Sequence, residues 1–98
     1  MRLKQYMYLY IILCSDDSFY TGVTNDLMNR YIDHEKGDNK RAYTYSRRPF
    51  KFLYWEIYES PEDAIHREKQ IKKWNRAKKN ALIYGNFGKL KKLAKRRK

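Results

Sequence analysis

"YLYIILCSDDSFYTG", residues 8–22, is the stretch that indicates the fold of this chain most clearly. Aromatic and β-branched residues, which favour strands, stand on both sides of CSDDS, whose polar residues favour a turn. The stretch therefore predicts a hairpin with a first strand at Tyr6–Leu13 and a second strand at FYTGV. Both alternating faces of the first strand are apolar, so we expect it to be covered on two sides. If the turn centres on Ser15, Tyr10 lies opposite Tyr20, with Cβ atoms about 5 Å apart.

The segment after the hairpin, TNDLMNRYIDHEKG, has the pattern of a helix. Thr24 or Asn25 can cap its start, and Gly37 is suited to end it. Arg30 and His34 are four residues apart, so their side chains project from the same face of the helix. The hairpin and this helix therefore bring two tyrosines, an arginine and a histidine into one short unit.

The rest of the chain predicts one more strand and further helices. FKFLYWEIY, Phe50–Tyr58, has the composition of a strand. In SPEDAIHREKQIKKW, Ser60 can cap a helix and Pro61 suits its first position. NRAKKNALIYG continues as a basic helix. We therefore expect an α+β fold, in which a small three-stranded antiparallel sheet is flanked by three or more helices. Residues 1–85 form one domain in this interpretation, and residues 86–98 form a basic tail.

Positive charge is concentrated in the C-terminal third of the chain. The net charge is +12, yet residues 1–68 hold ten Lys and Arg against eleven Asp and Glu. Residues 69–98 hold thirteen Lys and Arg and no acidic residue. Such asymmetry indicates a polyanionic partner, most simply nucleic acid bound through its phosphates. The alternative is that the basic helices only keep a small protein soluble.

Basic side chains in two places are candidate contacts to nucleic acid, in the middle loop and on the later helices. These candidates are Arg47, Arg48, Lys72, Lys73, Arg76, Lys78 and Lys79. Trp74 lies among them and could stack on a base. We expect Trp74 to pack in the core instead, because it neighbours Ile71 on the helix surface. Nothing in the pattern indicates that individual bases are recognised.

The cysteine content and the N-terminus indicate a cytoplasmic protein. Cys14 is the only cysteine, so no internal disulfide can form, and a reducing compartment fits. The apolar run before Cys14 is too short to span a membrane. It also contains three tyrosines and fits a strand better than a signal peptide. We expect no membrane association, and the sequence indicates no oligomeric state.

Glu68 is a carboxylate placed on an apolar helical face. At about 100° per residue, Glu68 falls in the middle of the stripe that Ala64, Ile65 and Ile71 form. A carboxylate in such a position bridges a buried cationic side chain or holds a metal ion. The hairpin offers no second carboxylate at metal-ligand spacing. A single carboxylate leaves most Mg²⁺ positions to water and substrate phosphate, which suits phosphodiester chemistry.

The triplets YLY at 8–10 and YTG at 20–22, followed by Arg30, His34 and Glu68, resemble the GIY-YIG nuclease family. NDLMNRYIDH resembles the segment after the family's second triplet, and EDAIHREKQIKKWNRAKK is similar to the Glu-bearing segment of its small stand-alone bacterial members. The resemblance spans nearly the whole chain. The first triplet has a tyrosine in place of the name-giving glycine, and the second has a threonine in place of isoleucine. Asn75 or Asn80 is a candidate for the family's late asparagine.

The resemblance implies metal-dependent hydrolysis of DNA, with Mg²⁺ or Mn²⁺ as the cofactor. Glu68 would bind the metal and Arg30 would hold the phosphate. Tyr10 or Tyr20 would be the base for water, with Arg30 and the metal favouring the phenolate. His34 would accept a proton from a tyrosine or orient it. The role of each tyrosine stays open.

The expected activity is that of an endonuclease, nicking or structure-directed, with low sequence specificity and a role in DNA repair or recombination. DNA is the expected partner, and RNA is not excluded. The alternative function is a non-catalytic basic module that binds DNA or RNA, including a ribosome-associated protein. Cleavage of supercoiled plasmid with and without Mg²⁺ distinguishes these alternatives.

Overall fold

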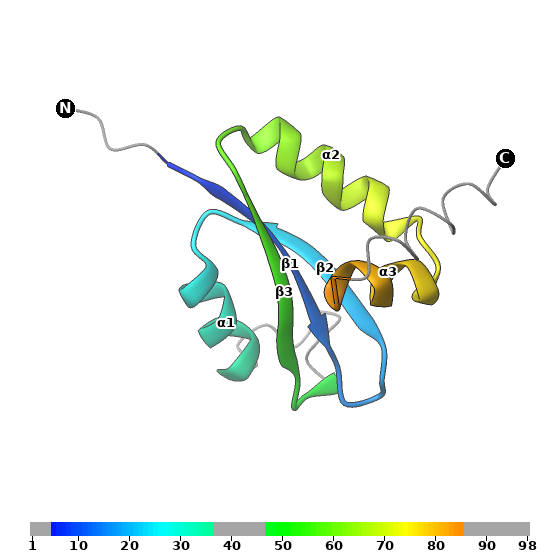
Figure 1. Ribbon diagram of the computed structural model, residues 1–98. Coiled ribbons are helices and arrows are strands. Elements are labelled where there is room, and N and C mark those ends of the chain that lie inside the picture. The colour runs from blue at the N-terminus through cyan, green and yellow to red at the C-terminus, as the bar shows by residue number, and fades with distance from the viewer. Residues whose placement is uncertain (1–4, 37–46, 86–98) are drawn as a thin grey trace, which may run out of the picture.

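The computed structural model describes residues 5–36 and 47–85 of the 98-residue chain. Its elements in chain order are β1 (Met7–Leu13), β2 (Phe19–Thr24), α1 (Leu27–Lys36), β3 (Lys51–Tyr58), α2 (Pro61–Lys72) and α3 (Arg76–Ile83). The three strands form one antiparallel sheet in the order β2-β1-β3. In Figure 1, α1 lies on one side of this sheet, and α2 and α3 lie on the other. The expected α+β fold with a three-stranded sheet is confirmed.

The central strand β1 contributes to a core on each face of the sheet. On one face, Leu9 and Ile11 pack with Ile71 of α2 and Leu82 of α3. On the other face, Tyr10 packs with Ile12 and Phe50. This two-sided burial explains why the β1 sequence is apolar at every position rather than at every second one.

The hairpin register differs from the expected one. Tyr10 pairs with Gly22, and Tyr20 pairs with Ile12. The turn runs from Cys14 to Ser18, whose carbonyl accepts a hydrogen bond from the Cys14 N–H at 2.8 Å, so its centre lies one residue later than Ser15. The resulting shift of two residues keeps both tyrosine side chains on the same face, because side chains alternate with a period of two.

Helix α1 begins later than the sequence suggested. Its cap is Asp26, whose Oδ1 accepts a hydrogen bond from the Asn29 N–H at 3.0 Å. Thr24, one of the two expected caps, instead accepts a hydrogen bond from the Asp26 N–H at 3.1 Å. Thr24 therefore shapes the turn into the helix and leaves the first helical turn to Asp26. The expected end at Gly37 lies outside the described residues.

Two helices, α2 and α3, follow β3. Pro61 occupies the first turn of α2 as expected, but the Ser60 side chain makes no cap bond and donates to Glu62 at 2.7 Å. The chain breaks between the helices at Asn75, whose side chain accepts a hydrogen bond from the Lys78 N–H at 2.9 Å. Asn75 thus has a structural role as the cap of α3.

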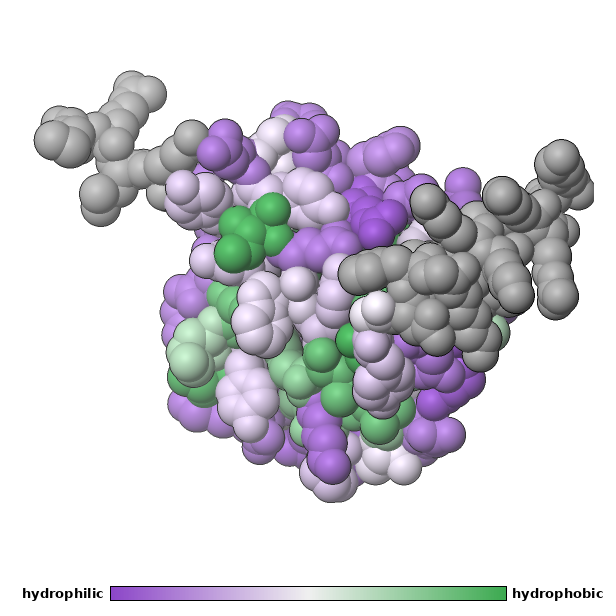
Figure 2. Space-filling view, in the orientation of Figure 1, coloured by the Kyte–Doolittle hydropathy of each residue, from purple (hydrophilic) through white to green (hydrophobic). Residues whose placement is uncertain are grey.

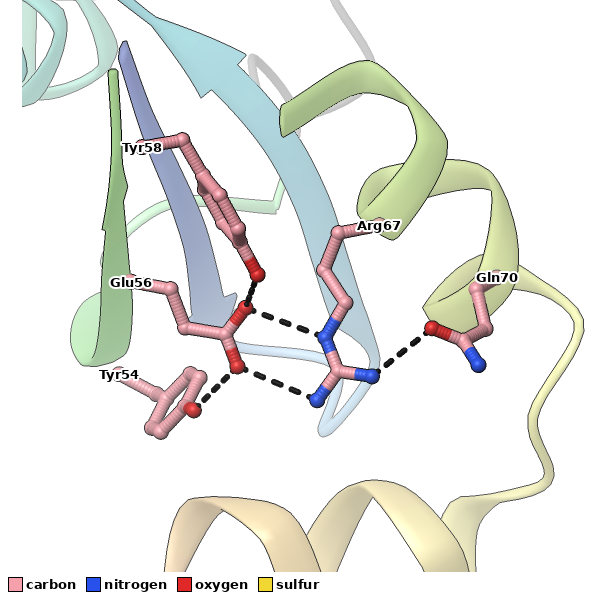
Figure 3. A network of polar contacts seen from close by, with 5 residues as sticks. All are labelled: Tyr54, Glu56, Tyr58, Arg67 and Gln70. Atoms are coloured by element: carbon pink, nitrogen blue, oxygen red, sulfur yellow. Dashed lines mark hydrogen bonds and ion pairs between the residues drawn. The ribbon is translucent and has the colours of Figure 1, made fainter. Parts of the chain in front are cut away.

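A half-buried ion pair fastens α2 to β3 (Figure 3). Arg67 donates through Nε and Nη2 to the two carboxylate oxygens of Glu56, at 3.1 and 3.2 Å. Tyr54 and Tyr58 donate to the same carboxylate at 2.5 and 2.6 Å, and Arg67 also donates to Gln70 at 2.8 Å. Burial raises the pKa of Glu56, but these hydrogen bonds and the Arg67 charge outweigh it and lower that pKa overall.

No helix in the parts of the chain that the structure describes is long and apolar enough to cross a membrane.

Candidate active site

Gly22 allows the Tyr10 side chain to cross strand β2. A Cβ atom at Gly22 would lie 2.6 Å from the Tyr10 hydroxyl oxygen and 2.7 Å from its Cζ. No side chain fits there without displacing the ring, so glycine is required by close approach rather than by its backbone angles. Because β2 is an edge strand, the Tyr10 hydroxyl reaches the edge of the sheet.

Tyr10, Tyr20 and His34 meet at this edge. The Tyr10 hydroxyl lies 3.3 Å from Nε2 of His34, within hydrogen-bonding distance. The Tyr20 ring centroid lies 6.2 Å from that of Tyr10 and 5.8 Å from that of His34. The hairpin supplies the tyrosines, and α1 follows β2 directly and carries the histidine. The structure thus brings together three of the five side chains that the sequence nominated.

Two phenylalanines form the inner wall of this cluster. The Phe52 ring stacks on Tyr10 with a centroid distance of 5.2 Å and an interplanar angle of 13°. The Phe50 ring meets His34 edge-on at 5.4 Å. The sequence indicated a strand here but not a wall of the site. A signal was present, because Phe50 and Phe52 alternate at the start of the strand.

The charges of Arg30 and Glu68 both affect the pKa of Tyr10. The positive charge of Arg30 lowers the pKa of Tyr10 and the negative charge of Glu68 raises it, so both groups act on the Tyr10 hydroxyl. Arg30 stands one turn before His34 on α1, whereas Glu68 belongs to α2 in the opposite layer (Figure 1). The two helices therefore bring opposite charges toward the tyrosine cluster.

Burial favours the uncharged forms of Tyr10 and His34. Burial, followed by the Tyr20 and Glu68 charges and a hydrogen bond with Tyr20, raises the pKa of Tyr10 well above its ordinary value despite Arg30. Burial and then the Arg30 charge lower the pKa of His34 below its ordinary value, against the opposing charge of Asp33. The Arg30 charge acts in the expected direction, towards the phenolate, but burial has the larger effect on the pKa of Tyr10.

Glu68 lies at the edge of the buried helical stripe, not in its middle. Ala64 and Ile71 are fully buried, but Ile65 is 40% exposed. The Glu68 side chain is 17% exposed, and its Oε2 lies 3.3 Å from Nζ of Lys72. The buried ion pair of α2 is made by Arg67, not by Glu68. Glu68 is thus partly accessible to solvent, and its cationic neighbour Lys72 is itself half exposed.

The donor set around Glu68 fits one hard divalent cation held mainly by water and phosphate. In residues 5–36 and 47–85, no three His, Cys, Asp or Glu side chains are grouped closely enough to enclose a metal ion. Mg²⁺ is commonly held by one or two carboxylates together with water and substrate phosphates. A single partly accessible carboxylate such as Glu68 matches that arrangement.

The predicted nucleic-acid contacts have different surroundings. Lys72 and Lys73 are exposed at the end of α2. Arg47 makes an ion pair with Asp16 at 2.9 Å, and Arg76 makes one with Asp17 at 3.3 Å, so both stabilise the β1–β2 turn.

The remaining predicted contacts are less open. Arg48 donates to the Glu35 carbonyl at 3.3 Å. Lys79 is half-buried, and burial followed by the charges of Arg76 and Lys72 lowers its pKa. Lys78 is only 5% exposed and lies 4.4 Å from the centroid of the Trp74 ring. Trp74 packs against the core as expected, and residues 86–98 lie outside the described chain.

Comparison with known proteins connects this geometry to a family. The GIY-YIG catalytic domain matches residues 6–81. A UPF0213 protein from Staphylococcus saprophyticus is 41% identical over 76 residues, which cover 78% of this chain and 92% of that protein. A UPF0213 protein from Syntrophus aciditrophicus is 43% identical over 79 residues, covering 81% of this chain and 91% of that protein.

Two solved structures are similar to this chain in fold and in sequence. The solution NMR structure of a protein from E. faecalis has a TM-score of 0.61 and 31% identity, covering 89% of this chain and 92% of that one. The solution NMR structure of a UPF0213 protein from Bacillus halodurans has a TM-score of 0.53 and 35% identity, covering 81% and 83%. The matched residues 6–81 include both tyrosines, Arg30, His34 and Glu68, and this chain belongs to the GIY-YIG nuclease family, alongside small UPF0213 proteins.

Proposed function

We propose that this protein is a Mg²⁺- or Mn²⁺-dependent DNA endonuclease that hydrolyses phosphodiester bonds. The observation that carries the proposal is the meeting of Tyr10, Tyr20 and His34 at one sheet edge, within reach of the charges of Arg30 and Glu68. Phenol, imidazole, guanidinium and carboxylate together provide proton transfer, phosphate binding and metal coordination.

The proposed roles follow from charge and burial. Glu68 holds the metal, which when bound polarises the scissile phosphate and stabilises the leaving oxygen. Arg30 binds the phosphate oxygens and offsets the charge that develops on them. Tyr10 keeps its proton at neutral pH and therefore suits a hydrogen-bond donor. Tyr20 is less buried and is the better candidate for the base, while His34 orients the Tyr10 hydroxyl.

The proposed substrate is DNA bound mainly through its phosphates, with low sequence specificity. The exposed cations at the end of α2, Lys72 and Lys73, support phosphate contacts. Lys72 also pairs with Glu68, so the backbone contacts adjoin the metal ligand. A nicking or structure-directed activity in DNA repair or recombination is the form that we propose.

The second candidate is a non-catalytic module that binds DNA or RNA. The observation that favours it is the raised pKa of Tyr10, which opposes a phenolate. The two candidates differ in one measurable property, which is Mg²⁺-dependent strand scission.

Cleavage of supercoiled plasmid with Mg²⁺, with Mn²⁺ and with EDTA tests the proposal. We expect nicking with either metal and none with EDTA. Glu68→Gln should lower the rate by about a hundredfold or more, because it removes the metal ligand but keeps the shape. Asp63→Asn is the matched control, an exposed carboxylate on the same helix. Nicking by Glu68→Gln at the wild-type rate contradicts the metal role, and metal-independent binding without nicking favours the second candidate.

Substrate preference is measured with the same variants. Single-stranded, duplex and branched DNA and a matched RNA are compared at equal nucleotide concentration. We expect the DNA substrates to be cut, with little dependence on sequence. Exclusive cleavage of RNA would contradict the proposed substrate.

A further inference from the structure

Strand β3 has exposed apolar side chains on the face of the sheet that α1 covers. Trp55 and Ile57 are 55% and 56% exposed, and both lie on the face that carries Tyr10, opposite Tyr10 and Tyr8 of β1. Met28 of α1 is exposed and lines the same groove as Trp55. Figure 2 shows green side chains over α1 and β3, whereas purple ones gather over α2. Contiguous apolar surface of this kind is typical of a binding interface.

This apolar strip borders a groove of about 590 Å³ between α1 and β3. The groove is lined by Tyr8, Asn25, Asp26, Leu27, Met28, Tyr31, Phe52 and Trp55. The lining includes one carboxylate and neither Lys nor Arg, so it lacks the cations that a phosphate backbone requires. The surface therefore suits a protein better than a nucleic acid. A surface without Lys or Arg also lets two cationic chains approach with little repulsion.

The outer edge of β3 adds backbone hydrogen-bonding capacity to this surface. In the order β2-β1-β3, no strand in residues 5–36 and 47–85 pairs with that edge. Edge strands are commonly blunted by proline or by charged side chains. The eight residues KFLYWEIY contain no proline, and the side chain of their one carboxylate, Glu56, is held by Arg67 on the opposite face. The one cation, exposed Lys51, stands at the first position of the strand and leaves the later positions without an exposed charge. An edge of this kind is a template for pairing with another strand.

We infer that β3 pairs with β3 of a second copy of this chain, antiparallel about a two-fold axis normal to the sheet. A strand that pairs with its own copy in this way is self-complementary, so a two-fold dimer closes without any other element. Such an axis keeps the two Tyr10-bearing faces on the same side. Trp55 and Ile57 then meet the partner's Trp55 and Ile57, and the two apolar strips merge into one buried strip between the α1 helices.

The dimer leaves the catalytic edges open, and it does not depend on the proposed nuclease function. Strand β2 lies at the opposite edge of the sheet from β3. In the resulting six-stranded sheet, the two Tyr10 and Tyr20 clusters therefore stand at the two outer edges. Two sites related by a two-fold axis match the two antiparallel strands of a DNA duplex.

Sedimentation equilibrium of the full chain measures the dimer directly. We expect the wild type to show a reversible monomer–dimer equilibrium with a mass that doubles as concentration rises. A Trp55→Lys/Ile57→Lys double variant should stay monomeric, because charges at the edge oppose pairing. Ile65→Lys is the matched control, since Ile65 is 40% exposed but belongs to α2. The control should dimerise like the wild type.

A second measurement needs no variant, which matters if the double variant fails to fold by circular dichroism. Amide hydrogen exchange of the wild type should show protection of β3 that increases with protein concentration, with α3 unchanged. A wild type that remains monomeric up to about 100 µM, where a micromolar dimer is assembled, overturns the proposal. So does a folded double variant that dimerises normally. A monomeric wild type whose DNA affinity falls in the double variant assigns the surface to nucleic acid instead.

Discussion

At the scale of single residues, the sequence nominated the chemical groups of the candidate site but not their protonation. Tyr10, Tyr20 and His34 were nominated from hairpin and helix patterns, and they lie together. The pKa shift of Tyr10 depends first on burial, to which the stacked ring of Phe52 contributes. Phe52 comes from a strand more than thirty residues later. A local sequence pattern gives no measure of that burial, so the sequence could not show that burial outweighs the effect of Arg30 on the pKa of Tyr10.

Tyr10→Phe and Tyr20→Phe test the separate roles of the hydroxyls. Each change removes one oxygen and keeps the ring that packs in the cluster. Loss of a general base typically costs about a hundredfold or more, so Tyr20→Phe should reduce single-turnover cleavage by that factor. Tyr10→Phe should reduce it less, because its hydroxyl donates rather than accepts the proton. The double variant should be little worse than Tyr20→Phe, since groups that act as a unit are not additive.

The controls for the tyrosine variants are structural. The circular dichroism spectrum and the melting temperature should change little, because neither ring is removed. Equal and full activity in both single variants would return these residues to ordinary packing. A larger loss in Tyr10→Phe than in Tyr20→Phe would reverse the assignment of the base.

At the scale of elements, composition located the strands and helices, whereas side-chain contacts fixed their registers and ends. Polar residues marked the β1–β2 turn, but its centre depends on hydrogen bonds between Cys14 and Ser18 and on Asp17, whose φ is 68°. Tyr10 and Tyr20 still share a face of the sheet, as expected, because the register differs from the expected one by two residues. The Glu56–Arg67 pair was not predicted, since its two members lie eleven residues apart on a strand and a helix.

Arg67→Met tests whether this pair fixes α2 against β3. It leaves the Glu56 carboxylate half-buried with only the Tyr54 and Tyr58 hydroxyls (Figure 3). Hydrogen bonds to charged groups contribute about 1.5–3 kcal/mol when buried. Because the Arg67 side chain is 23% exposed, we expect a loss of about 1–2 kcal/mol in the free energy of unfolding, measured with urea.

Two further variants make the Arg67 result specific. Lys69→Met removes an exposed cation from the same helix and should leave stability nearly unchanged. In the Glu56→Gln/Arg67→Met double variant, the uncompensated charge is gone, so the loss should be smaller than the sum of the single losses. Strict additivity would show that the two groups do not stabilise each other.

At the scale of the whole molecule, the sequence predicted the architecture and the asymmetry of charge. The alternation of strand and helix patterns was sufficient for an α+β fold, because each pattern is local. The sequence could not show that α1 covers one face of the sheet and that α2 and α3 cover the other. It also could not show that apolar side chains of β3 are exposed. Both depend on which faces meet in space. The arrangement separates an apolar surface over β3 from the cations at the end of α2.

The same burial that shapes the site should limit the pH range of the whole fold. Burial and then hydrogen bonds to Glu56 raise the pKa of Tyr54, and the same causes raise that of Tyr58 to about 12. Tyr10 is raised chiefly by burial. The unfolded chain ionises its tyrosines near pH 10, whereas these three keep their protons in the folded state. Their contribution to the free energy of unfolding is therefore fully present below about pH 10 and is lost as pH rises above that value.

At acid pH the change in stability runs in the opposite direction, because stability is lost as pH falls. The pKa of His34 is lowered in the folded state, so its contribution is present above about pH 6.5 and is lost as pH falls through the lowered value. Glu56, whose pKa is also lowered, adds a further loss below about pH 4.5. Urea unfolding from pH 4 to pH 12 should therefore show a plateau of stability between about pH 7 and pH 10.

The absorbance of phenolate, followed as a function of pH, tests whether burial keeps these tyrosines protonated in the folded protein. In the folded protein a group of tyrosines should ionise only as circular dichroism reports unfolding, above about pH 11. Tyr54→Phe should reduce the alkaline slope of the unfolding free energy by up to one proton, because the slope counts protons that differ between the states. If all ten tyrosines ionise together near pH 10 while the fold stays intact, burial does not control their protonation. The inference that burial raises the pKa of Tyr10 would then fail with it, because it depends on the same physical cause.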